Sequence, residues 1–229
     1  GVNVLDAPPA ITTNGGADLT IAALNENTDT NTSVLQLAVA DVNATDPLDP
    51  LYQQPLTWTL AGGTAGLFQI DSTGNITLAS SPNFEALAIA GQTQQVLTAT
   101  VSDGTYSDSI QVTLNIANVD EASTGAPFIA NYAYTNGGER ATLIGATTLS
   151  DPDLVTATNA TGAVPAGYQW QRLQAGTWNN IGGATNATLT NQQNTTVRLT
   201  QVYTDVGGQK IVVSDDTAII TANGGNNIR

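Results

Sequence analysis

Apolar and polar residues alternate with a period of two in short segments along the whole chain, and this pattern limits the possible folds most strongly. Such alternation is typical of strands that bury one face. The segments are rich in Val, Ile, Leu and Thr, and Gly, Asn, Asp and Pro separate them, as in antiparallel sandwiches. In the first half they are LTIAAL (19–24), SVLQLAVAD (33–41), LTWTL (56–60), NITLAS (75–80), QVLTATVSD (95–103) and SIQVTLNIA (109–117).

The same pattern resumes in the second half, so we expect two β-sandwiches in tandem; only FEALAIA (84–90) predicts a turn of helix. A chain of 229 residues suits two domains of this kind. The predicted fold class is all-β, with two Greek-key sandwiches. The second-half segments are FIANYAY (128–134), ATLIGAT (141–147), YQWQRL (168–173), TWNNIGG (177–183), NATLTN (186–191), TVRLTQVYTD (196–205) and KIVVSDDTAIITA (210–222).

A short acidic phrase occurs twice, at the spacing of one small domain. NVLDAPPA occupies residues 3–10 and NVDEASTGAP occupies residues 118–127, an offset of 118 − 3 = 115 residues. We interpret both phrases as joints between domains, and the chain as a fragment of a larger protein. The predicted organisation is a remnant of a preceding linker (1–9), a first sandwich (10–121), a linker (122–127), a second sandwich (128–222) and a flexible tail (223–229).

The composition excludes several classes of function. The chain has no Cys and no His, which removes disulfides, thiolate chemistry, Ser-His-Asp triads and imidazole-bound zinc. Its net charge is −14, and Lys210 is its only lysine. The chain therefore lacks the basic side chains that would contact the phosphates of a nucleic acid. No apolar run is long enough to span a membrane. Carboxylates and carbonyls remain as metal ligands, and such hard oxygen ligands favour calcium.

Several phrases of the first half occur in an order that resembles the cadherin repeat, in the form found in large bacterial surface adhesins. The resemblance covers about residues 10–121, and its most specific element is FQIDSTGNI (68–76). The phrases are NEN (25–27), NATDPLDP (43–50), LFQIDSTGNITL (67–78), NFE (83–85), ATVSDGTYSDS (99–109) and NVDE (118–121).

The resemblance implies calcium binding at the joint between consecutive domains. It places Glu26, Asn83 and Glu85 at the base of the first domain and Asn118, Asp120 and Glu121 in the linker. Asp6, Asp46 and Asp49 would face a preceding domain. Asn83 stands where the family has an aspartate, and Asp46 and Asp49 are three residues apart instead of two. Both departures predict weaker binding than at a vertebrate cadherin joint, since fewer carboxylates lower the affinity.

The distribution of glutamate supports the same sites independently. Of the four glutamates, Glu26, Glu85 and Glu121 occupy proposed ligand positions, and only Glu139 does not. A glutamate can bind calcium through both oxygens, which suits the high coordination number of this ion. The alternative is that these are solvated loop acids.

The second half resembles the immunoglobulin-like repeats that accompany cadherin-like repeats in the same adhesins. The resemblance covers about residues 124–222 and rests on TLSDPDL (148–154), YQWQRLQAGTWNNIGGATNATLT (168–190) and VRLTQVYTDVGGQKIVVSD (197–215). It implies that Trp170 is a buried strand residue, and we expect Trp178 and Tyr203 to pack as well.

The aspartates of the second half allow two interpretations. Asp151 and Asp153 either point back at the linker as calcium ligands or form an ordinary Asx-Pro turn. We expect Asp205, Asp215 and Asp216 to be solvated turn acids, although they could form a weak cation site.

These observations predict a calcium-stiffened extender of a bacterial surface adhesin that supports cell adhesion. It would be secreted or on the cell surface, monomeric as a fragment, and in contact with neighbouring repeats, calcium and neither nucleic acid nor membrane. We expect no enzymatic activity, because the acids lie in turns without a cleft-forming insertion. One alternative is a glycan- or peptide-binding module of a secreted or surface-layer protein that uses exposed aromatics, and a second is an accessory pair of domains on a secreted hydrolase. The candidate aromatics are Tyr52, Tyr106, Tyr132, Tyr134 and Trp178.

Overall fold

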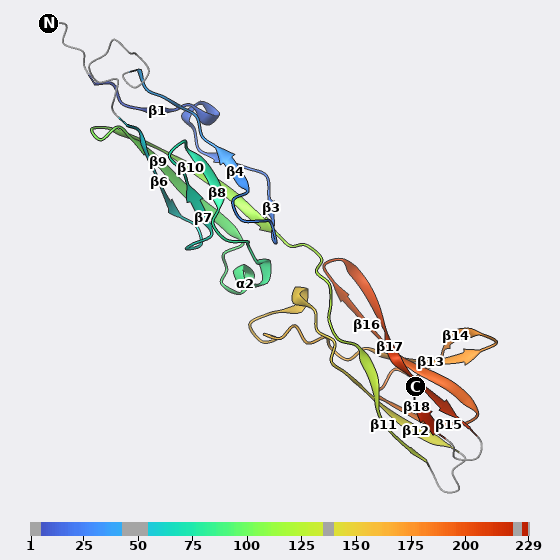
Figure 1. Cartoon of the computed structure of the whole chain (residues 1–229). Coiled ribbons are helices and arrows are strands. Elements are labelled where there is room, and N and C mark those ends of the chain that lie inside the picture. Colours follow the sequence, from blue (N-terminus) through green and yellow to red (C-terminus); the bar gives the residue numbers. More distant parts are fainter. Residues whose placement is uncertain (1–5, 43–54, 135–139, 222–225, 229) are drawn as a thin grey trace, which may run out of the picture. The chain divides into compact units, whose positions relative to one another are not determined.

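The computed structural model describes residues 6–42, 55–134, 140–221 and 226–228. The chain divides into two compact units, Gly1–Val119 and Asp120–Arg229 (Figure 1). Three residues singled out from the sequence, Asp46, Asp49 and Tyr52, lie outside the described residues.

The first unit consists mainly of short and medium strands. Among its described residues, one α-helical turn also occurs. The helix α2 (Phe84–Ile89) confirms the single helical turn that the sequence predicts. A 3₁₀ turn, η1 (Thr13–Gly16), follows the first strand. The strands are β1 (Ala10–Ile11), β2 (Leu19–Thr20), β3 (Leu24–Asn25), β4 (Ser33–Gln36), β5 (Val39–Ala40), β6 (Thr57–Gly62), β7 (Phe68–Ile70), β8 (Asn75–Leu78), β9 (Gln94–Ser102) and β10 (Ser107–Ala117).

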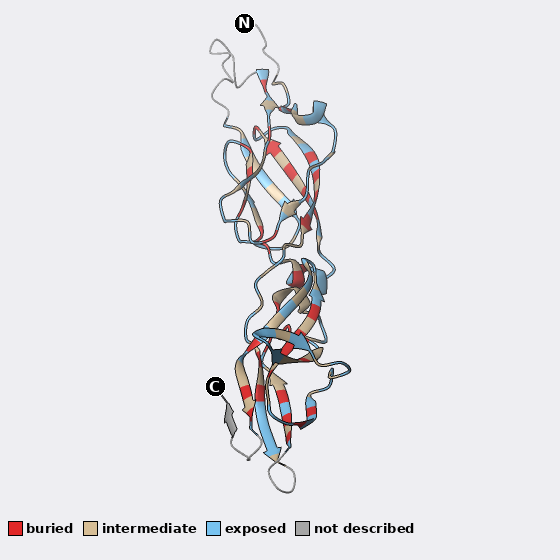
Figure 2. Ribbon diagram, turned by 90° about the vertical axis from the view of Figure 1, so that its right-hand side faces the viewer, coloured by how far each residue is buried: buried red, intermediate tan, exposed pale blue. Residues whose placement is uncertain are grey.

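Two sheets enclose the core of the first unit. One has the order β2-β10-β9-β6, with β3 also pairing β10, and the other has the order β4-β8-β7. The strands β2 and β3 run parallel to β10, whereas β9 runs antiparallel to it. Along β9 the buried residues alternate with more exposed ones, as the period-two pattern predicts. Figure 2 shows buried bands alternating with more exposed ones along strands of the structure. Ile76, Leu97 and Leu114 are completely buried between the sheets.

One predicted strand of the first unit, at residues 33–41, is interrupted because its two halves pair with different strands. The segment 33–41 gives β4, which pairs β8, and β5, which pairs β1 in a separate two-stranded sheet. Between them the N–H of Leu37 donates to the Gly74 carbonyl and that of Ala38 to the Thr13 hydroxyl. The segment therefore changes partners at Leu37, and its apolar period continues through the break.

The second unit also consists of strands, with one described 3₁₀ turn, η2 (Pro152–Leu154). Each of its strands from β11 to β17 overlaps a segment that the sequence predicts. The strands are β11 (Pro127–Tyr134), β12 (Ala141–Thr147), β13 (Tyr168–Gln174), β14 (Thr177–Asn180), β15 (Thr188–Gln192), β16 (Thr195–Asp205), β17 (Gly208–Ile220) and β18 (Asn226–Ile228).

The two sheets of the second unit have the orders β11-β12-β15 and β14-β13-β16-β17-β18. Since β12 pairs β15 while β13 pairs β16, the chain crosses between the sheets more than once. Trp170 is completely buried, and its indole N–H donates to the Asn186 carbonyl at 3.0 Å. The predicted core role of Trp170 is confirmed, as is the prediction of all-β sandwiches.

A smaller apolar cluster lies at the end of the second unit where the chain enters it. Leu149, Val164 and Tyr203 form this cluster, against which Leu154 and Val212 pack. The β16–β17 hairpin is long enough to reach from the main core to this end (Figure 1). Its turn, Asp205–Gly208, therefore places polar side chains beside the start of the unit.

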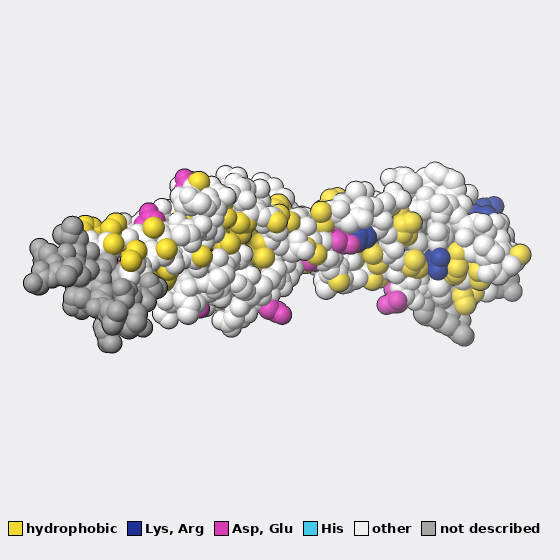
Figure 3. All heavy atoms as spheres, turned by 90° about the horizontal axis from the view of Figure 1, so that it is seen from above, with side chains coloured by type: hydrophobic (Ala, Val, Ile, Leu, Met, Phe, Trp, Pro, Cys, Tyr) yellow, Lys and Arg dark blue, Asp and Glu magenta, His cyan; other side chains and the backbone are white. Residues whose placement is uncertain are grey.

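Charged side chains are sparse on the surface of both units. Most of the face in Figure 3 is backbone or uncharged polar side chain, with scattered apolar atoms, in agreement with a charged fraction of 10%. Within the described ranges, no helix has the length and apolar character needed to cross a membrane.

Candidate metal centre

Glu26 is a buried carboxylate at the end of the first unit where the chain leaves it. It follows β3, and Asn27 takes a left-handed conformation with φ of 57°, which Asn tolerates better than most residues. Only 2% of Glu26 is exposed. One carboxylate oxygen accepts from the N–H of Phe84 at 2.6 Å and the other from the N–H of Val119 at 2.9 Å. Glu26 therefore ties α2 and the last residue of the unit to the end of β3.

Glu85 lies in the first turn of α2 and is also buried, with 4% exposed. Its carboxylate lies close to that of Glu26, with an oxygen of each within 4.8 Å of the other. Two buried carboxylates at this distance repel each other, so a cation would stabilise the pair.

Asn83, the third residue predicted for this end, caps α2. Its side-chain oxygen accepts from the N–H of Ala86 at 2.7 Å, and its backbone is extended, as is usual at an N-cap. The structure thus gives Asn83 a local role that the motif comparison does not contain. Its role as a metal ligand stays a prediction.

Asn118 contributes a further oxygen at the same end of the first unit. Its side-chain carbonyl oxygen is buried and has no hydrogen-bond partner among the described residues. A buried acceptor without a donor is uncommon, because its desolvation is then uncompensated. A cation is one group that would satisfy this oxygen.

Among the predicted ligands that the structure describes, Asp151 is the most buried, with 1% exposed. One oxygen caps η2 by accepting from the N–H of Asp153 at 3.0 Å, and the other accepts from the Tyr203 hydroxyl at 2.6 Å. Burial, followed by this hydrogen bond, raises the pKa of Tyr203. The predicted Asx-Pro turn is therefore present. Tyr203 packs in an apolar cluster as expected, and its hydroxyl also donates a hydrogen bond to Asp151.

Asp153 faces the residues that open the second unit. One carboxylate oxygen accepts from the N–H of Glu121 at 2.9 Å, and the other is buried without a hydrogen-bond partner among the described residues. Burial is the main cause that raises the pKa of Asp153, and the charges of Asp151, Glu121 and Asp205 add to it. The interpretation of the Asp-Pro-Asp phrase as an Asx-Pro turn is confirmed for Asp151. That Asp151 and Asp153 bind calcium stays a prediction.

Asp120, Asp153 and Asp205 form a second carboxylate cluster, entirely within the second unit. Each offers an oxygen within 4.8 Å of the others. The side chain of Asp205 has 0% exposed surface, and neither of its oxygens has a hydrogen-bond partner among the described residues, although one of them forms an ion pair with the Lys210 ammonium at 3.4 Å. The expectation that Asp205 is a solvated turn acid is wrong, because its position at the end of β16 directs it inward. Asp215 and Asp216 lie within β17 instead of a turn.

Two aspartates at the opposite end of the first unit were not assigned from the sequence. Asp41 directly follows β5 and Asp103 directly follows β9, and both are buried. One oxygen of Asp103 accepts from the N–H groups of Thr105 and Tyr106, and the other has no hydrogen-bond partner among the described residues. Asp6 likewise has one buried oxygen without such a partner. The available signal was the position of each acid at the end of an alternating segment.

The donors of these clusters are carboxylate and amide oxygens, which suit calcium. Calcium takes six to eight oxygen ligands in flexible geometry, whereas zinc prefers nitrogen and sulfur. Within the first unit the buried Asn118 oxygen, and within the second unit the buried Asp153 oxygen, have no hydrogen-bond partner among the described residues, and each suits a cation of this kind. The residues present therefore fit a hard divalent cation.

The aromatic side chains give less support to a ligand-binding face. Trp178 is half-buried, and the Arg198 guanidinium stacks on it at 4.4 Å from the ring centroid. Tyr132 and Tyr134 contact each other edge to face, with centroids 6.4 Å apart. The flat exposed tryptophan that would favour glycan binding is thus covered by an arginine.

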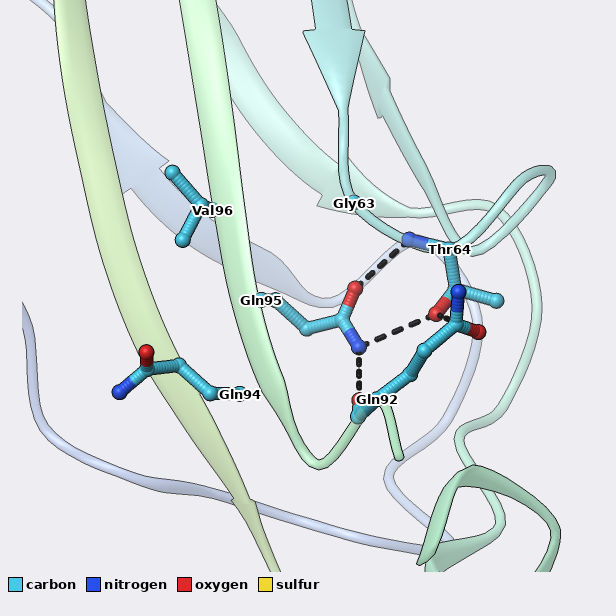
Figure 4. A pocket seen from close by; sticks show the side chains of 6 residues that line it. All are labelled: Gly63, Thr64, Gln92, Gln94, Gln95 and Val96. Carbon is cyan, nitrogen blue, oxygen red and sulfur yellow. Dashed lines mark hydrogen bonds between the residues drawn. The ribbon is translucent and has the colours of Figure 1, made fainter. Parts of the chain in front are cut away.

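A hollow in the first unit has a structural explanation (Figure 4). Gln95 lines it and is buried; its carbonyl oxygen accepts from the N–H of Thr64 at 2.7 Å. The Gln95 amide donates to the Thr64 hydroxyl and to the Gln92 carbonyl. These contacts satisfy Gln95 and hold the Gly63–Thr64 turn against β9.

Comparison with known proteins gives structural similarity without a sequence match. No protein-family model matches the chain, and no curated protein matches it significantly. Human protocadherin-24 EC1-2 is similar with a TM-score of 0.46 and 13% identity, over 91% of this chain and 95% of that one. Drosophila N-cadherin EC1-4 has a TM-score of 0.47 and 14% identity, over 91% of this chain and 48% of that one.

Human desmocollin-1 ectodomain is similar with a TM-score of 0.40 and 14% identity, over 92% of this chain and 37% of that one. These three structures are cadherin extracellular domains, the family that residues 10–121 resemble in their motifs. Their TM-scores lie below 0.5 and their identities below 25%, so they assign neither a family nor a function to this chain.

Proposed function

We propose that this chain is a calcium-stiffened segment of an extracellular bacterial adhesin, with the ions bound where its two units join. The proposal assigns Glu26, Asn83, Glu85 and Asn118 from the first unit as ligands. It assigns Asp120, Glu121, Asp151 and Asp153 from the second. Asp6, Asp46 and Asp49 would serve a preceding domain in the same way.

The main support for the proposal is that carboxylates of each unit accept hydrogen bonds from backbone N–H groups close to the point where the two units are connected. Glu26 holds the N–H of Val119, the last residue of the first unit, and Asp153 holds the N–H of Glu121. Val119 and Glu121 are two residues apart, so their Cα atoms are separated by at most about 7 Å. Covalent connection alone thus keeps the acids of both units near one short segment.

The expected effect of calcium follows from charge. Without a cation, the carboxylates of the two units repel each other across a short linker, and the joint can bend. A divalent ion bound by ligands from both units would join them, and its binding free energy would add to the stability of the joined state. The segment would then project more distant modules from the cell surface.

Small-angle X-ray scattering of the full chain in calcium chloride and in chelator tests the mechanical part. We expect a larger maximum dimension and a narrower range of conformations in calcium than in chelator. Identical curves in the two conditions would remove the stiffening role.

Isothermal calorimetry tests the ligands separately. Glu85→Gln should weaken calcium binding, because it removes one charged oxygen pair from the base of the first unit. Asp29→Asn removes an exposed acid from the same unit and is the matched control. Equal calcium affinity for the two variants would argue against Glu85 as a ligand.

A further inference from the structure

The lysine of the second-unit cluster is the only lysine in the chain. Lys210 lies on β17, and its ammonium nitrogen is 2.6 Å and 2.7 Å from the two oxygens of Asp120. The same nitrogen is 3.4 Å from an oxygen of Asp205. An ammonium group therefore contacts two of the three aspartates that form the cluster.

Strand register explains how the ammonium reaches this place. Lys210 pairs directly with Tyr203 across the β16–β17 hairpin, and Asp205 lies two residues beyond Tyr203. Paired residues and residues two apart share one face of a sheet, so Lys210 and Asp205 project to the same side. Gly207 lies in the turn, where a Cβ atom would collide with the Asp120 carboxylate. The hairpin is therefore shaped to hold Asp120 against Lys210.

The cluster needs a positive charge even without calcium. The Asp205 side chain is fully buried, and neither oxygen has a hydrogen-bond partner among the described residues. A buried carboxylate without compensation is strongly unfavourable, and three carboxylates within 4.8 Å repel one another. Within the described part of the chain, Lys210 makes the ion pairs that offset this charge.

We propose that the Lys210 ammonium competes with a divalent cation for the Asp120–Asp153–Asp205 cluster and so lowers the calcium affinity of the second unit. This inference rests on the proposed function, because it concerns the same joint. One ammonium carries half the charge of a calcium ion and binds fewer oxygens, so it stabilises the cluster only in part. At low calcium the lysine holds the aspartates; at high calcium it must be displaced into solvent.

Calcium titration of the full chain by calorimetry tests the proposal, with Lys210→Met compared with the native protein. We expect Lys210→Met to bind calcium more tightly, on the order of tenfold or more, or to bind one additional ion. Arg140→Gln is the control for the loss of a positive charge away from the cluster. Arg140 lies at the start of β12, whereas the turn that carries Asp153 follows the opposite end of that strand. It should titrate like the native chain.

Thermal unfolding gives a second readout that depends on the same contact. In chelator, Lys210→Met should melt below the native protein, and calcium should restore its melting temperature. The double variant Asp205→Asn with Lys210→Met removes both charges and should recover much of the loss in chelator. If Lys210→Met fails to fold in chelator, recovery in the double variant still supports the pairing, and no recovery contradicts it.

The outcomes separate this inference from the proposed function. Equal calcium binding by the native chain and Lys210→Met overturns the competition and leaves the calcium-bound joint in place. Binding by Lys210→Met alone supports the competition and contradicts calcium binding by the native joint. Binding by neither protein overturns both.

Discussion

The carboxylate of Glu26 accepts a hydrogen bond from the backbone N–H of Val119, although 93 residues separate the two in the sequence. Its second oxygen accepts from the N–H of Phe84 at the start of α2. One buried side chain therefore joins three segments of the first unit, whatever ion it also binds. Any test of Glu26 as a metal ligand must separate this structural role from the binding role.

Glu26→Gln should destabilise the first unit even in chelator. The amide has one carbonyl oxygen, so it can accept from Phe84 or from Val119, and the other N–H would face an NH₂ group. Leaving a buried donor unsatisfied costs about 1–3 kcal/mol. Urea unfolding in chelator measures this loss. Asp29→Asn, an exposed change in the same unit, should unfold like the native chain, and equal stability of both variants would contradict the structural role.

Tyr203→Phe should destabilise the second unit by removing one hydroxyl. The hydroxyl donates to Asp151, which is 1% exposed, so its loss leaves a buried carboxylate oxygen without that donor. Hydrogen bonds to charged groups contribute about 1.5–3 kcal/mol. Thermal or urea unfolding would report the change. Tyr106→Phe is the matched control, because Tyr106 is 47% exposed, and a comparable loss there would contradict the assignment.

The strands could be predicted from the sequence because alternation records burial directly. In β9, Val101 and Ala99 are completely buried between less buried neighbours, and the period-two pattern is enough to place them. The break at Leu37 could not be predicted, since β4 and β5 continue one apolar period while pairing with different strands. Partner choice depends on contacts far along the chain, which a local pattern does not contain.

The sequence indicates which residues are candidate ligands, but it does not indicate how deeply each of them is buried. The positions of Glu26 and Glu85 follow from their motifs, yet their burial depends on α2 closing over the end of the unit. The burial of Asp205 differs from the prediction, because a carboxylate before Val-Gly-Gly is typical of an exposed turn. Its burial results from the aspartates and the lysine that surround it, which the fold brings from three separate segments.

Asp71 predicts a pH dependence that is independent of calcium. Its carboxylate accepts from the Thr73 hydroxyl, the Asn75 N–H and the Thr73 N–H, and these hydrogen bonds lower its pKa, with the Thr73 hydroxyl as the largest cause. A lowered pKa in the folded state means that the ionised carboxylate stabilises the fold above the unfolded pKa. This stabilisation is lost as the pH falls through the lower, folded value.

The stability difference between the native chain and Asp71→Asn should therefore be full near neutral pH and shrink below about pH 4. Melting temperatures of both proteins in chelator, measured across this range, check the prediction. Asp29→Asn provides the control for loss of an exposed charge in the same unit. A difference that stayed constant or grew on acidification would contradict the hydrogen-bonded role of the Asp71 carboxylate.

Asn83 allows the helix cap and the metal ligand to be tested apart. An aspartate accepts the same N–H of Ala86 as Asn83 does, so Asn83→Asp should preserve the stability of α2 in chelator. It also restores the charge that the related motif carries at this position, and calcium affinity should rise because carboxylate charge governs binding. Asn83→Ala removes the cap and should cost about 1 kcal/mol in chelator. Calorimetric titration together with unfolding in chelator measures both effects. If Asn83→Asp bound calcium no more tightly than the native chain, Asn83 would be a cap and not a ligand.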